Sequence, residues 1–485
     1  MLLGIDIGTS ACKAALFDFD GGVVSQRAET YPTLYPSAGF AEQNPDDWWE
    51  AVKKAIGKLE CDKSKIEGIG VAGQSWAAVF VDKNRNVTAN TPIWFDTRAD
   101  GICRELDESF GWETFFKVGK NPLKPTYTLP KILWFKKHYP ELFGKVYTVL
   151  QSNSFIVERL TGEITQDISQ CYGYQTFSMG NRSFDEALSR EAGLDLSLVP
   201  QVFACHQIVG RVSRRAAEQT GLKEGTPVVA GGLDAACGTL GTGVYTAGQT
   251  QEQGGQAGGM SICLDEIKAD PRLIFGAHVV KDLWLLQGGT TGGGGVLNWF
   301  RTQLGGSFSE LDAMAESVSA GSEGVVFLPY MAGERSPIWD ENAKGVFYGL
   351  DFSKTKGHLA RAAMEGVCFS LRHNLEIAAK AGAKADVLYS TGGAANSAFW
   401  TQLKSDITGR HVKVASADTT TTLGAAMLAG VGTGVYGSFE EAVERCVEVR
   451  REYMPNTRND TAYNDSYSLY LEIYEKLRET MSKRM

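Results

Sequence analysis

The sequence Leu2-Leu3-Gly4-Ile5-Asp6-Ile7-Gly8-Thr9-Ser10 opens a series of short apolar runs separated by glycine turns. Two further runs, over residues 11–18 and 23–29, flank the turn Asp20-Gly21-Gly22. Glycine pairs between such runs are typical of hairpins, so we expect three strands near the start of the chain. The pair Asn44-Pro45 then predicts a helix over residues 46–59, with Asn as its cap and Pro in its first turn.

The first turn has the residues that an anion site needs. Gly8 permits a tight turn in which backbone N–H groups can face a phosphate. Thr9, Ser10 and Lys13 add hydrogen-bond donors and a positive charge. Asp6, at the end of the strand, could hold a magnesium ion through water, because Mg²⁺ keeps much of its hydration shell. The alternative is an ordinary hairpin turn, and the turn alone leaves both interpretations open.

A similar opening recurs in the middle of the chain. Residues 226–231 predict a strand that ends in Gly-Gly, and a strand–glycine turn–strand pattern follows over residues 249–264. Strands alternating with helices predict an α/β fold in two related halves, which we divide into residues 1–245 and 246–485. Further helices are expected over residues 130–138, 152–160, 184–192, 212–219, 233–240, 357–381, 397–408, 421–430 and 462–482.

A second acidic residue stands where a helix begins, in Gly231-Gly232-Leu233-Asp234. A helix N-terminus favours the ionised carboxylate, and two glycines let another molecule approach the backbone closely. These are the requirements of a general base that accepts a proton from a hydroxyl. A helix cap would use an Asp in the same way, so the two interpretations are evenly balanced on these residues alone.

Glycine-rich helix entries point to a nucleotide. One covers residues 288–295, and another is Thr391-Gly392-Gly393-Ala394-Ala395, followed by Asn396. Helix N-termini bind phosphate, and a single such turn carries little weight. Several in one chain, together with the turn after Asp6, indicate nucleotide binding.

Composition excludes several classes of protein. The 485 residues are 43% hydrophobic and 22% charged, which is ordinary for a globular protein and argues against disorder or a coiled coil. The formal charge of −9 argues against a nucleic acid or a membrane surface as partner. Nine scattered cysteines are typical of reduced thiols in the cytoplasm. We find no secretory signal and no apolar run long enough to span a membrane.

Four motifs resemble those of the FGGY carbohydrate kinases, in the actin-like ATPase superfamily, and the resemblance runs from Leu3 to about Val435. A first signature, from Thr128 through Lys131 to His138, is imperfect because its opening position is Thr126. The others, which match well, are Gly345-x-Phe347-x-Gly349-Leu350 with His358-Leu359-x-x-Ala362-Ala363-Met364-Glu365, Leu328-Pro329-Tyr330-Met331-Ala332-Gly333-Glu334-Arg335-Ser336-Pro337, and Trp94-Phe95-Asp96-Thr97-Arg98.

The resemblance implies two RNase-H-like domains, each a mixed sheet flanked by helices, that close on an interdomain cleft. It implies ATP and Mg²⁺ as cofactors, a small sugar as substrate, Asp234 as catalytic base and Asp6 beside the metal. The remaining roles follow by position. ATP contacts are implied for Gly8, Thr9, Ser10, Lys13, Gly255, Gly292, Gly392, Gly393, Ala394 and Asn396, and substrate contacts for Gln74, Ser75, Trp76, Tyr127 and Asp234.

The chain also departs from the family pattern. Xylulose kinases usually have Met-His where this chain has Ser75-Trp76, and often Asn where it has Ala235. The second phosphate loop, usually GTSG, is Gly254-Gly255-Gln256-Ala257-Gly258-Gly259, without the hydroxyls. We therefore expect a cytoplasmic sugar kinase, with D-xylulose or another ketopentose as substrate, and leave a homodimer open.

Three alternatives remain. One is a kinase for another substrate, such as ribulose, gluconate, erythritol or glycerol. A second is a degenerate kinase that binds sugar or nucleotide and regulates another process, which the altered second phosphate loop favours and the intact Asp6 and Asp234 oppose. The third is a chaperone-like or actin-like ATPase, and the complete second signature argues against it.

Trp76 could also be a core residue instead of a substrate contact, because most tryptophans are buried.

Overall fold

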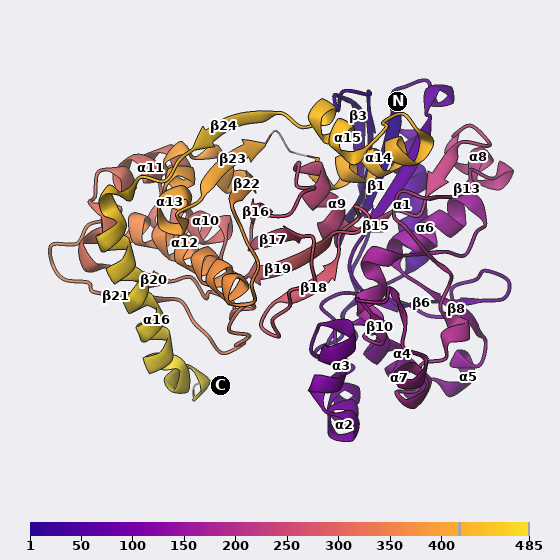
Figure 1. Ribbon diagram of the computed structural model, residues 1–485, viewed down its shortest axis with the longest axis horizontal. Helices are drawn as coiled ribbons and strands as arrows, with labels where there is room; N and C mark the ends of the chain where they lie inside the picture. Colours follow the sequence, from indigo (N-terminus) through magenta and orange to yellow (C-terminus); the bar gives the residue numbers. More distant parts are fainter. Residues whose placement is uncertain (416–418, 484–485) are drawn as a thin grey trace.

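The computed structural model describes residues 1–415 and 419–483, which form two sheet-containing parts side by side along the long axis of the molecule (Figure 1). The first sheet has the strand order β13-β14-β5-β1-β2-β3, with β15 paired to β5. Its strands are β1 (Leu2–Ile7), β2 (Ala11–Phe17), β3 (Val23–Thr30), β5 (Gly68–Gly73), β13 (Ile208–Arg211), β14 (Pro227–Val229) and β15 (Gly232–Leu233).

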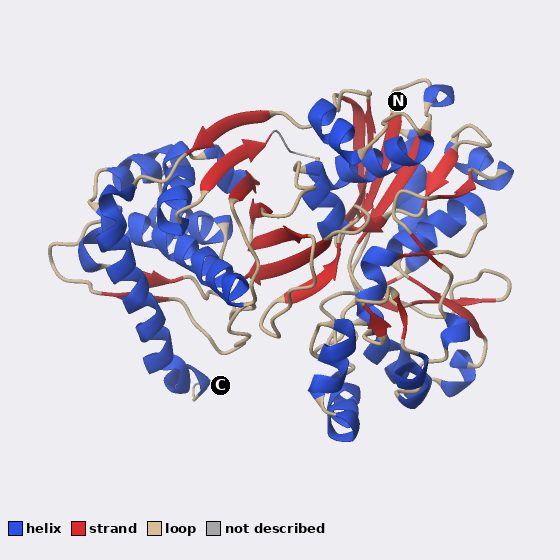
Figure 2. Ribbon diagram, in the orientation of Figure 1, coloured by secondary structure: helices blue, strands red, loops and turns tan. Residues whose placement is uncertain are grey.

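The second sheet has the strand order β18-β19-β17-β16-β22-β23-β24. Its strands are β16 (Gln249–Gly254), β17 (Gly258–Leu264), β18 (Ile274–Ala277), β19 (Trp284–Thr290), β22 (Val387–Thr391), β23 (His411–Ala415) and β24 (Val449–Tyr453). All residues of β1 are buried, and so are most of those of β17, because helices cover both faces of these sheets (Figure 2).

The two sheets share one pattern of strand directions. In the first, β1 is antiparallel to β2 and β2 to β3, while β1 is parallel to β5 and β5 to β14. In the second, β16, β17, β19, β22 and β23 repeat the same directions in the same order. This agreement supports two related halves, as the repeated glycine-turn openings suggest, and it is the mixed α/β architecture expected from the sequence.

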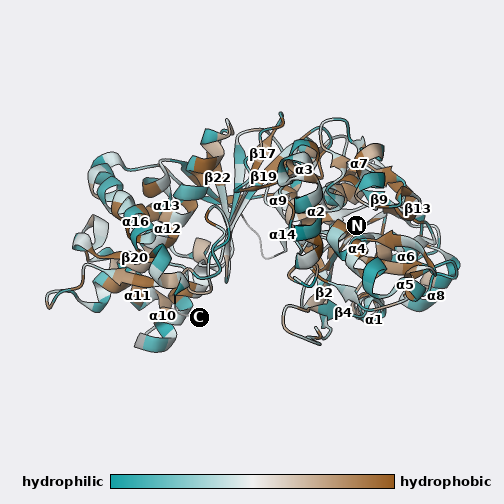
Figure 3. Ribbon diagram, turned by 90° about the horizontal axis from the view of Figure 1, so that it is seen from below, coloured by the Kyte–Doolittle hydropathy of each residue, from teal (hydrophilic) through white to brown (hydrophobic). Residues whose placement is uncertain are grey.

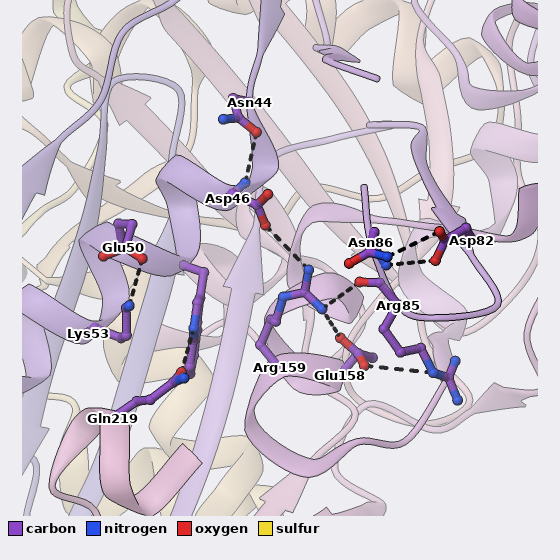
Figure 4. Close-up of polar contacts among 11 residues, drawn as sticks. Asn44, Asp46, Glu50, Lys53, Asp82, Arg85, Asn86, Glu158, Arg159 and Gln219 are labelled. Carbon is purple, nitrogen blue, oxygen red and sulfur yellow. Dashed lines mark hydrogen bonds and ion pairs between the residues drawn. The ribbon is translucent and has the colours of Figure 1, made fainter. Parts of the chain in front are cut away.

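Helices of the first part lie against its sheet and are joined by polar contacts. They include α1 (Pro45–Gly57), α6 (Ser152–Thr161) and α8 (Arg214–Thr220). Arg159 of α6 donates to Asp46 of α1 at 3.3 Å and to the carbonyl of Arg85 at 3.0 Å (Figure 4). Trp49 of α1 donates to Gln219 of α8 at 3.0 Å. These contacts fix the outer layer while its apolar faces cover β1 and β2.

One segment from late in the chain returns to the first sheet. Helix α14 (Thr420–Thr433) packs on β1 and β5, where a Cβ at Gly4 would lie 1.9 Å from the carbonyl oxygen of Thr422. It also packs on α9 (Asp234–Gly241). Figure 1 shows α14 and α15 (Phe439–Cys446) beside β1 and β3. A division at residue 245 therefore separates the two sheets, but it does not assign α14 and α15 to the part that they contact.

The helices and strands expected from the sequence are present with small shifts of their ends. The helix expected over residues 357–381 is α12 (Lys356–Lys380), and the one over 462–482 is α16 (Asp460–Ser482). The side chain of Asn44 caps α1 by accepting from Asp46. Many helices carry hydrophilic and hydrophobic residues in alternation along the ribbon, as amphipathic helices on a sheet do (Figure 3), whereas α14 is buried from Thr422 to Gly430. Within the described residues, every helix is too short or too polar to cross a membrane.

Candidate active site

Strand register brings the two candidate carboxylates to one edge of the first sheet. Asp6 of β1 lies opposite Ala72 of β5, and Ala72 lies opposite Gly232 of β15. Asp234 follows Gly232 by two residues and begins α9. Because adjacent strands are about 4.8 Å apart, the ends of β1 and β15 are separated by roughly two strand spacings. Asp6 and Asp234 therefore face the same region.

Both carboxyl groups hold protons more tightly than usual. Desolvation by the surrounding protein raises the pKa of Asp234 from 3.8 to about 7, with the nearby charge of Asp6 as a second cause. Burial raises the pKa of Asp6 to about 6, and Lys13, opposite Asp6 on β2, opposes the rise. A pKa near neutrality suits a general base, because the group is then both available and basic at the working pH.

Asp234 is not the cap of its helix. The N-cap of α9 is Leu233, and the Asp234 carboxylate accepts only from the adjacent Ala235 N–H, at 2.6 Å, among the described contacts. An N-cap side chain would instead accept from an N–H two or three residues further on. This geometry favours the chemical interpretation of Asp234 over the helix-cap alternative.

The first glycine turn is held rigidly by three side chains from other elements. The Tyr31 hydroxyl donates to the carbonyl of Gly8. The Gln43 amide donates to the carbonyl of Thr9 at 2.7 Å, and the Trp94 indole donates to the Thr9 hydroxyl at 2.9 Å. The turn is therefore held in one conformation before any ligand binds, which lowers the entropic cost of binding.

Two side chains at this turn, Ser10 and Lys13, take no part in the contacts that hold Gly8 and Thr9. Ser10 and Lys13 are both exposed, so both are free to meet a ligand from solvent. Gly8 and Thr9 are half-buried. The four residues expected to contact phosphate therefore surround one short turn beside Asp6.

The turn expected to contact the sugar is mostly buried. Gln74 is fully buried and donates to Gln43 at 2.9 Å, which links it to the first glycine turn. Ser75 is half-buried. Trp76 is 8% exposed, and its ring packs at nearly a right angle to the Tyr127 ring, with 4.5 Å between the ring centroids. Trp76 therefore belongs mostly to the core, and little of its surface is left for a substrate.

Trp76 adopts a backbone conformation that is rare for a bulky residue, with φ of 55°. Such strain costs about 1–3 kcal/mol and persists only where neighbours enforce it. Here Lys131 donates to the carbonyl of Trp76 at 2.9 Å, and the Trp76 N–H donates to Gln170 at 3.1 Å. Strained residues cluster at functional sites, so the turn is a candidate for function as well as packing.

Lys131 is a functional candidate that sequence reasoning quoted only as part of a motif. It is fully buried and donates to the carbonyls of Trp76 and Ile93, the second at 2.8 Å. Burial lowers the pKa of its ammonium group to about 7, and Asp96 opposes that shift. Lys131 thus joins the Trp76 turn to the turn that carries Trp94. Its place in the helical pattern of residues 130–138 gives no sign of this role.

Three glycine turns of the second half meet at one place. The Gly294 N–H, at the start of α10 (Gly294–Leu304), donates to the carbonyl of Gly255 at 2.7 Å. A Cβ at Gly392 would lie 2.8 Å from the carbonyl of Gly254, so the turn before α13 (Ala398–Thr408) touches the same loop. A Cβ at Gly292 would lie 2.4 Å from the carbonyl of Pro329. The close approach of these backbones requires glycine at positions 292, 294 and 392.

The residues expected to meet adenosine differ in exposure. Gly392, Gly393 and Asn396 are exposed, whereas Ala394 is buried. Gly392 has φ of 84°, a conformation that glycine adopts at little cost. The exposed backbone at Gly392 and Gly393 lies beside the Gly254 loop, which groups the expected nucleotide contacts of the second half in one surface.

Residues 1–241 match the N-terminal domain of the FGGY family of carbohydrate kinases, and residues 271–433 match its C-terminal domain. The chain belongs to the FGGY family of carbohydrate kinases. A xylulose kinase of Bacillus subtilis (strain 168) is 32% identical over 481 residues, which cover 98% of this chain and 96% of that protein. The chain is therefore an ATP-dependent carbohydrate kinase.

Solved structures share the fold across the whole chain. The crystal structure of xylulose kinase from Rhodospirillum rubrum superposes with a TM-score of 0.92 at 28% identity and covers 99% of both chains. The crystal structure of gluconate kinase from Lactobacillus acidophilus also gives a TM-score of 0.92, at 25% identity, and covers 100% of this chain and 99% of that one. The two-part fold expected from the motifs is confirmed.

Proposed function

We propose that this carbohydrate kinase phosphorylates a ketopentose and that D-xylulose is the first candidate. The observation that carries the proposal is the pairing of Asp6 and Asp234 at one edge of the first sheet, beside a rigid glycine turn. Similarity to xylulose kinases over nearly the full length supports the choice of sugar.

In the proposed reaction, a sugar hydroxyl attacks the γ-phosphorus of ATP. The new O–P bond forms as the bond from phosphorus to the ADP oxygen breaks, and the hydroxyl proton passes to the Asp234 carboxylate. Positioning and charge neutralisation carry most of the catalysis in such transfers. Lys13 and Ser10, both exposed at the first glycine turn, would meet the transferred phosphoryl group. Gly392, Gly393 and Asn396 would meet the adenosine.

A magnesium ion fits beside Asp6. The Oδ1 atom of Asp6 is buried and has no hydrogen-bond partner in the part of the chain that the structure describes. A buried acceptor without a donor costs free energy unless a ligand completes it. Asp6 would hold Mg²⁺, which neutralises phosphate charge when bound. Gly8 and Thr9 are fixed next to Asp6 by the contacts described above, so they would order the phosphates around it.

Substrates other than D-xylulose are the second candidate. The sugar turn has Ser75-Trp76 in place of the Met-His of xylulose kinases, and the gluconate kinase of Lactobacillus acidophilus shares the fold equally well. Buried polar groups discriminate strongly between hydroxyl arrangements, because an unmatched donor or acceptor costs about 1–3 kcal/mol. We infer that another ketose, a polyol or a sugar acid is also accepted.

The cellular setting is part of the proposal. The nine cysteines form no disulfide among the described residues, which fits a reducing compartment such as the cytoplasm. The proposal also allows a homodimer, which the fold is compatible with.

The decisive measurement is ADP release from MgATP by the purified protein across D-xylulose, D-ribulose, D-gluconate, erythritol and glycerol. We expect the greatest kcat/KM with a ketopentose, and loss of that activity in Asp234→Asn. Activity on none of these acceptors would contradict the proposed function and favour a binding protein without kinase activity.

A further inference from the structure

We propose that Asp167 and Ser169 are positioning residues that hold the backbone on which the base Asp234 stands; the inference rests on the proposed role of Asp234. Both lie in or beside η2 (Ile168–Tyr174), far in sequence from Asp234, and neither has a side chain that reaches the surface. They act through the N–H of Leu233, the residue immediately before the base.

The contacts form a chain of three groups. The Leu233 N–H donates to the Ser169 hydroxyl oxygen at 2.8 Å. The Ser169 hydroxyl donates its only hydrogen to Oδ1 of Asp167. A hydroxyl that has committed its hydrogen to a carboxylate presents only lone pairs elsewhere, so Asp167 makes Ser169 a fixed acceptor for Leu233. The start of α9, and with it the Asp234 side chain, is thereby tied to η2.

Asp167 is itself held as an acceptor. Its Oδ2 accepts from Asn153 at 2.9 Å, and its Oδ1 also accepts from the Gln170 N–H at 3.1 Å. Donors on both oxygens require a carboxylate or its equivalent, because an amide would place an NH₂ group against one of them. The cost of burying this charge is a reason to expect a specific role for it.

The close packing at Gly232 shows that the Ser169 contact is built into the backbone. A Cβ at Gly232 would lie 3.0 Å from the Ser169 hydroxyl oxygen and 2.7 Å from a methyl group of Val279. Glycine at this position lets β15 approach Ser169 closely enough for the Leu233 bond. The Gly-Gly that precedes Asp234 in the sequence thus serves the positioning of the base.

The same network also holds the turn expected to contact the sugar. Gln170 accepts from the Trp76 N–H at 3.1 Å and donates to Asn153 at 3.0 Å. Ser152 donates to the carbonyl of Gln74 at 2.9 Å. One buried set of side chains therefore joins the sugar turn to the base, which would fix the distance between the substrate hydroxyl and its proton acceptor. A misplacement of about 1 Å can cost about 10²-fold in rate.

The test compares Ser169→Ala, Asp167→Asn and a matched control, Ser189→Ala. Ser189 is also fully buried in the same part of the molecule and donates to Thr176 at 2.9 Å, away from the base. We expect Ser169→Ala and Asp167→Asn to lower kcat by about ten- to hundredfold. The ATP KM should stay within about twofold, and Ser189→Ala should keep the wild-type kcat while its melting temperature falls as much as that of Ser169→Ala.

The second readout is Ser169→Ala in an Asp234→Asn background. Positioning predicts that the loss of kcat largely disappears there, because the group being positioned has lost its function. A wild-type kcat in both Ser169→Ala and Asp167→Asn, or the same fold loss with and without Asp234→Asn, would overturn the inference while sugar phosphorylation by the wild type stands. If Ser169→Ala does not fold, the isosteric Asp167→Asn replaces it, and its loss of kcat is compared with and without Asp234→Asn. A wild type that phosphorylates no sugar would overturn both the inference and the function on which it rests.

Discussion

Replacing Asp234 by Asn should have opposite effects on rate and on stability. The substitution keeps the size and a hydrogen-bonding oxygen, but it removes the proton acceptor. Loss of a general base costs about 10²- to 10⁴-fold in rate. We expect a fall of this size in phosphorylation of the best sugar, with nucleotide affinity nearly unchanged, because Asp234 contacts no part of the expected adenosine surface.

The stability effect follows from the pKa of Asp234. Its pKa is 3.8 in an ordinary environment and about 7 in the folded protein, first because of desolvation and then because of Asp6. The folded state therefore binds more protons than the unfolded state between these values, and stability falls as pH rises from about 4 to above 7. A rise of this size corresponds to about 4 kcal/mol if the group were fully isolated from water. Because Asp234 keeps part of its surface in solvent, we expect a penalty of roughly 1–3 kcal/mol at pH 8.

The assay is denaturant unfolding of wild type and Asp234→Asn at pH 8 and pH 4, without nucleotide or Mg²⁺. The variant should be more stable by about 1–3 kcal/mol at pH 8, and the gain should shrink toward pH 4, where the wild-type carboxyl is protonated in the folded state and partly protonated in the unfolded state. The same pKa predicts that wild-type kcat/KM rises as pH increases through about 7. An equal stability difference at both pH values, or full activity in Asp234→Asn, would show that the base has been placed wrongly.

Asp6→Ala should weaken Mg²⁺-dependent turnover far more than sugar binding, and a collapse of sugar affinity with intact turnover at saturating sugar would contradict the metal role. Trp76→Ala should raise the sugar KM about tenfold, equivalent to about 1.4 kcal/mol, and leave the ATP KM nearly unchanged in steady-state kinetics on ketopentoses and polyols; strict D-xylulose specificity with an unaltered sugar KM would leave Trp76 a core residue only. Lys131→Met removes the donor to the Trp76 and Ile93 carbonyls and should lower the free energy of unfolding by about 2–4 kcal/mol. The exposed Lys136→Met is the control, and equal losses in denaturant unfolding would refute the special role of Lys131.

The elements that the sequence predicts well are those with a strong local signal. The hairpins at the start of the chain, the Asn44-capped helix and the helix before the C-terminus all depend on turn residues or apolar periodicity. Helices α2 (Asp100–Phe110) and α11 (Phe308–Glu316) were not expected. Both nevertheless carry local signals that the prediction did not use. The apolar residues Ile102, Cys103 and Leu106 lie on one face of α2, and Ser307 with Glu310 forms a capping box at the start of α11.

The candidate site divides in the same way. Asp6 and Asp234 can be proposed from sequence because each stands beside glycines at the end of a strand or the start of a helix. Ser169 and Lys131 cannot, because their roles depend on hydrogen bonds to residues at least 38 positions away, and Asp167 acts only through Ser169. A local sequence pattern does not predict which buried polar side chain will hydrogen-bond to which distant backbone group.

The two halves of the chain differ in the surroundings of one equivalent acidic position. Asp6 lies opposite the penultimate residue of its parallel neighbour β5, and Glu252 of β16 holds the same place relative to β22, opposite Ser390. Glu252 is paired with the buried Lys404 at 2.7 Å and accepts from Ser390. Asp6 keeps one buried oxygen without a hydrogen-bond partner among the described residues. The two similar sheets thus have equivalent acidic positions. Glu252 is neutralised by an internal cation, whereas the unpaired oxygen of Asp6 is the reason why we propose Asp6, and not Glu252, as the residue that meets a ligand.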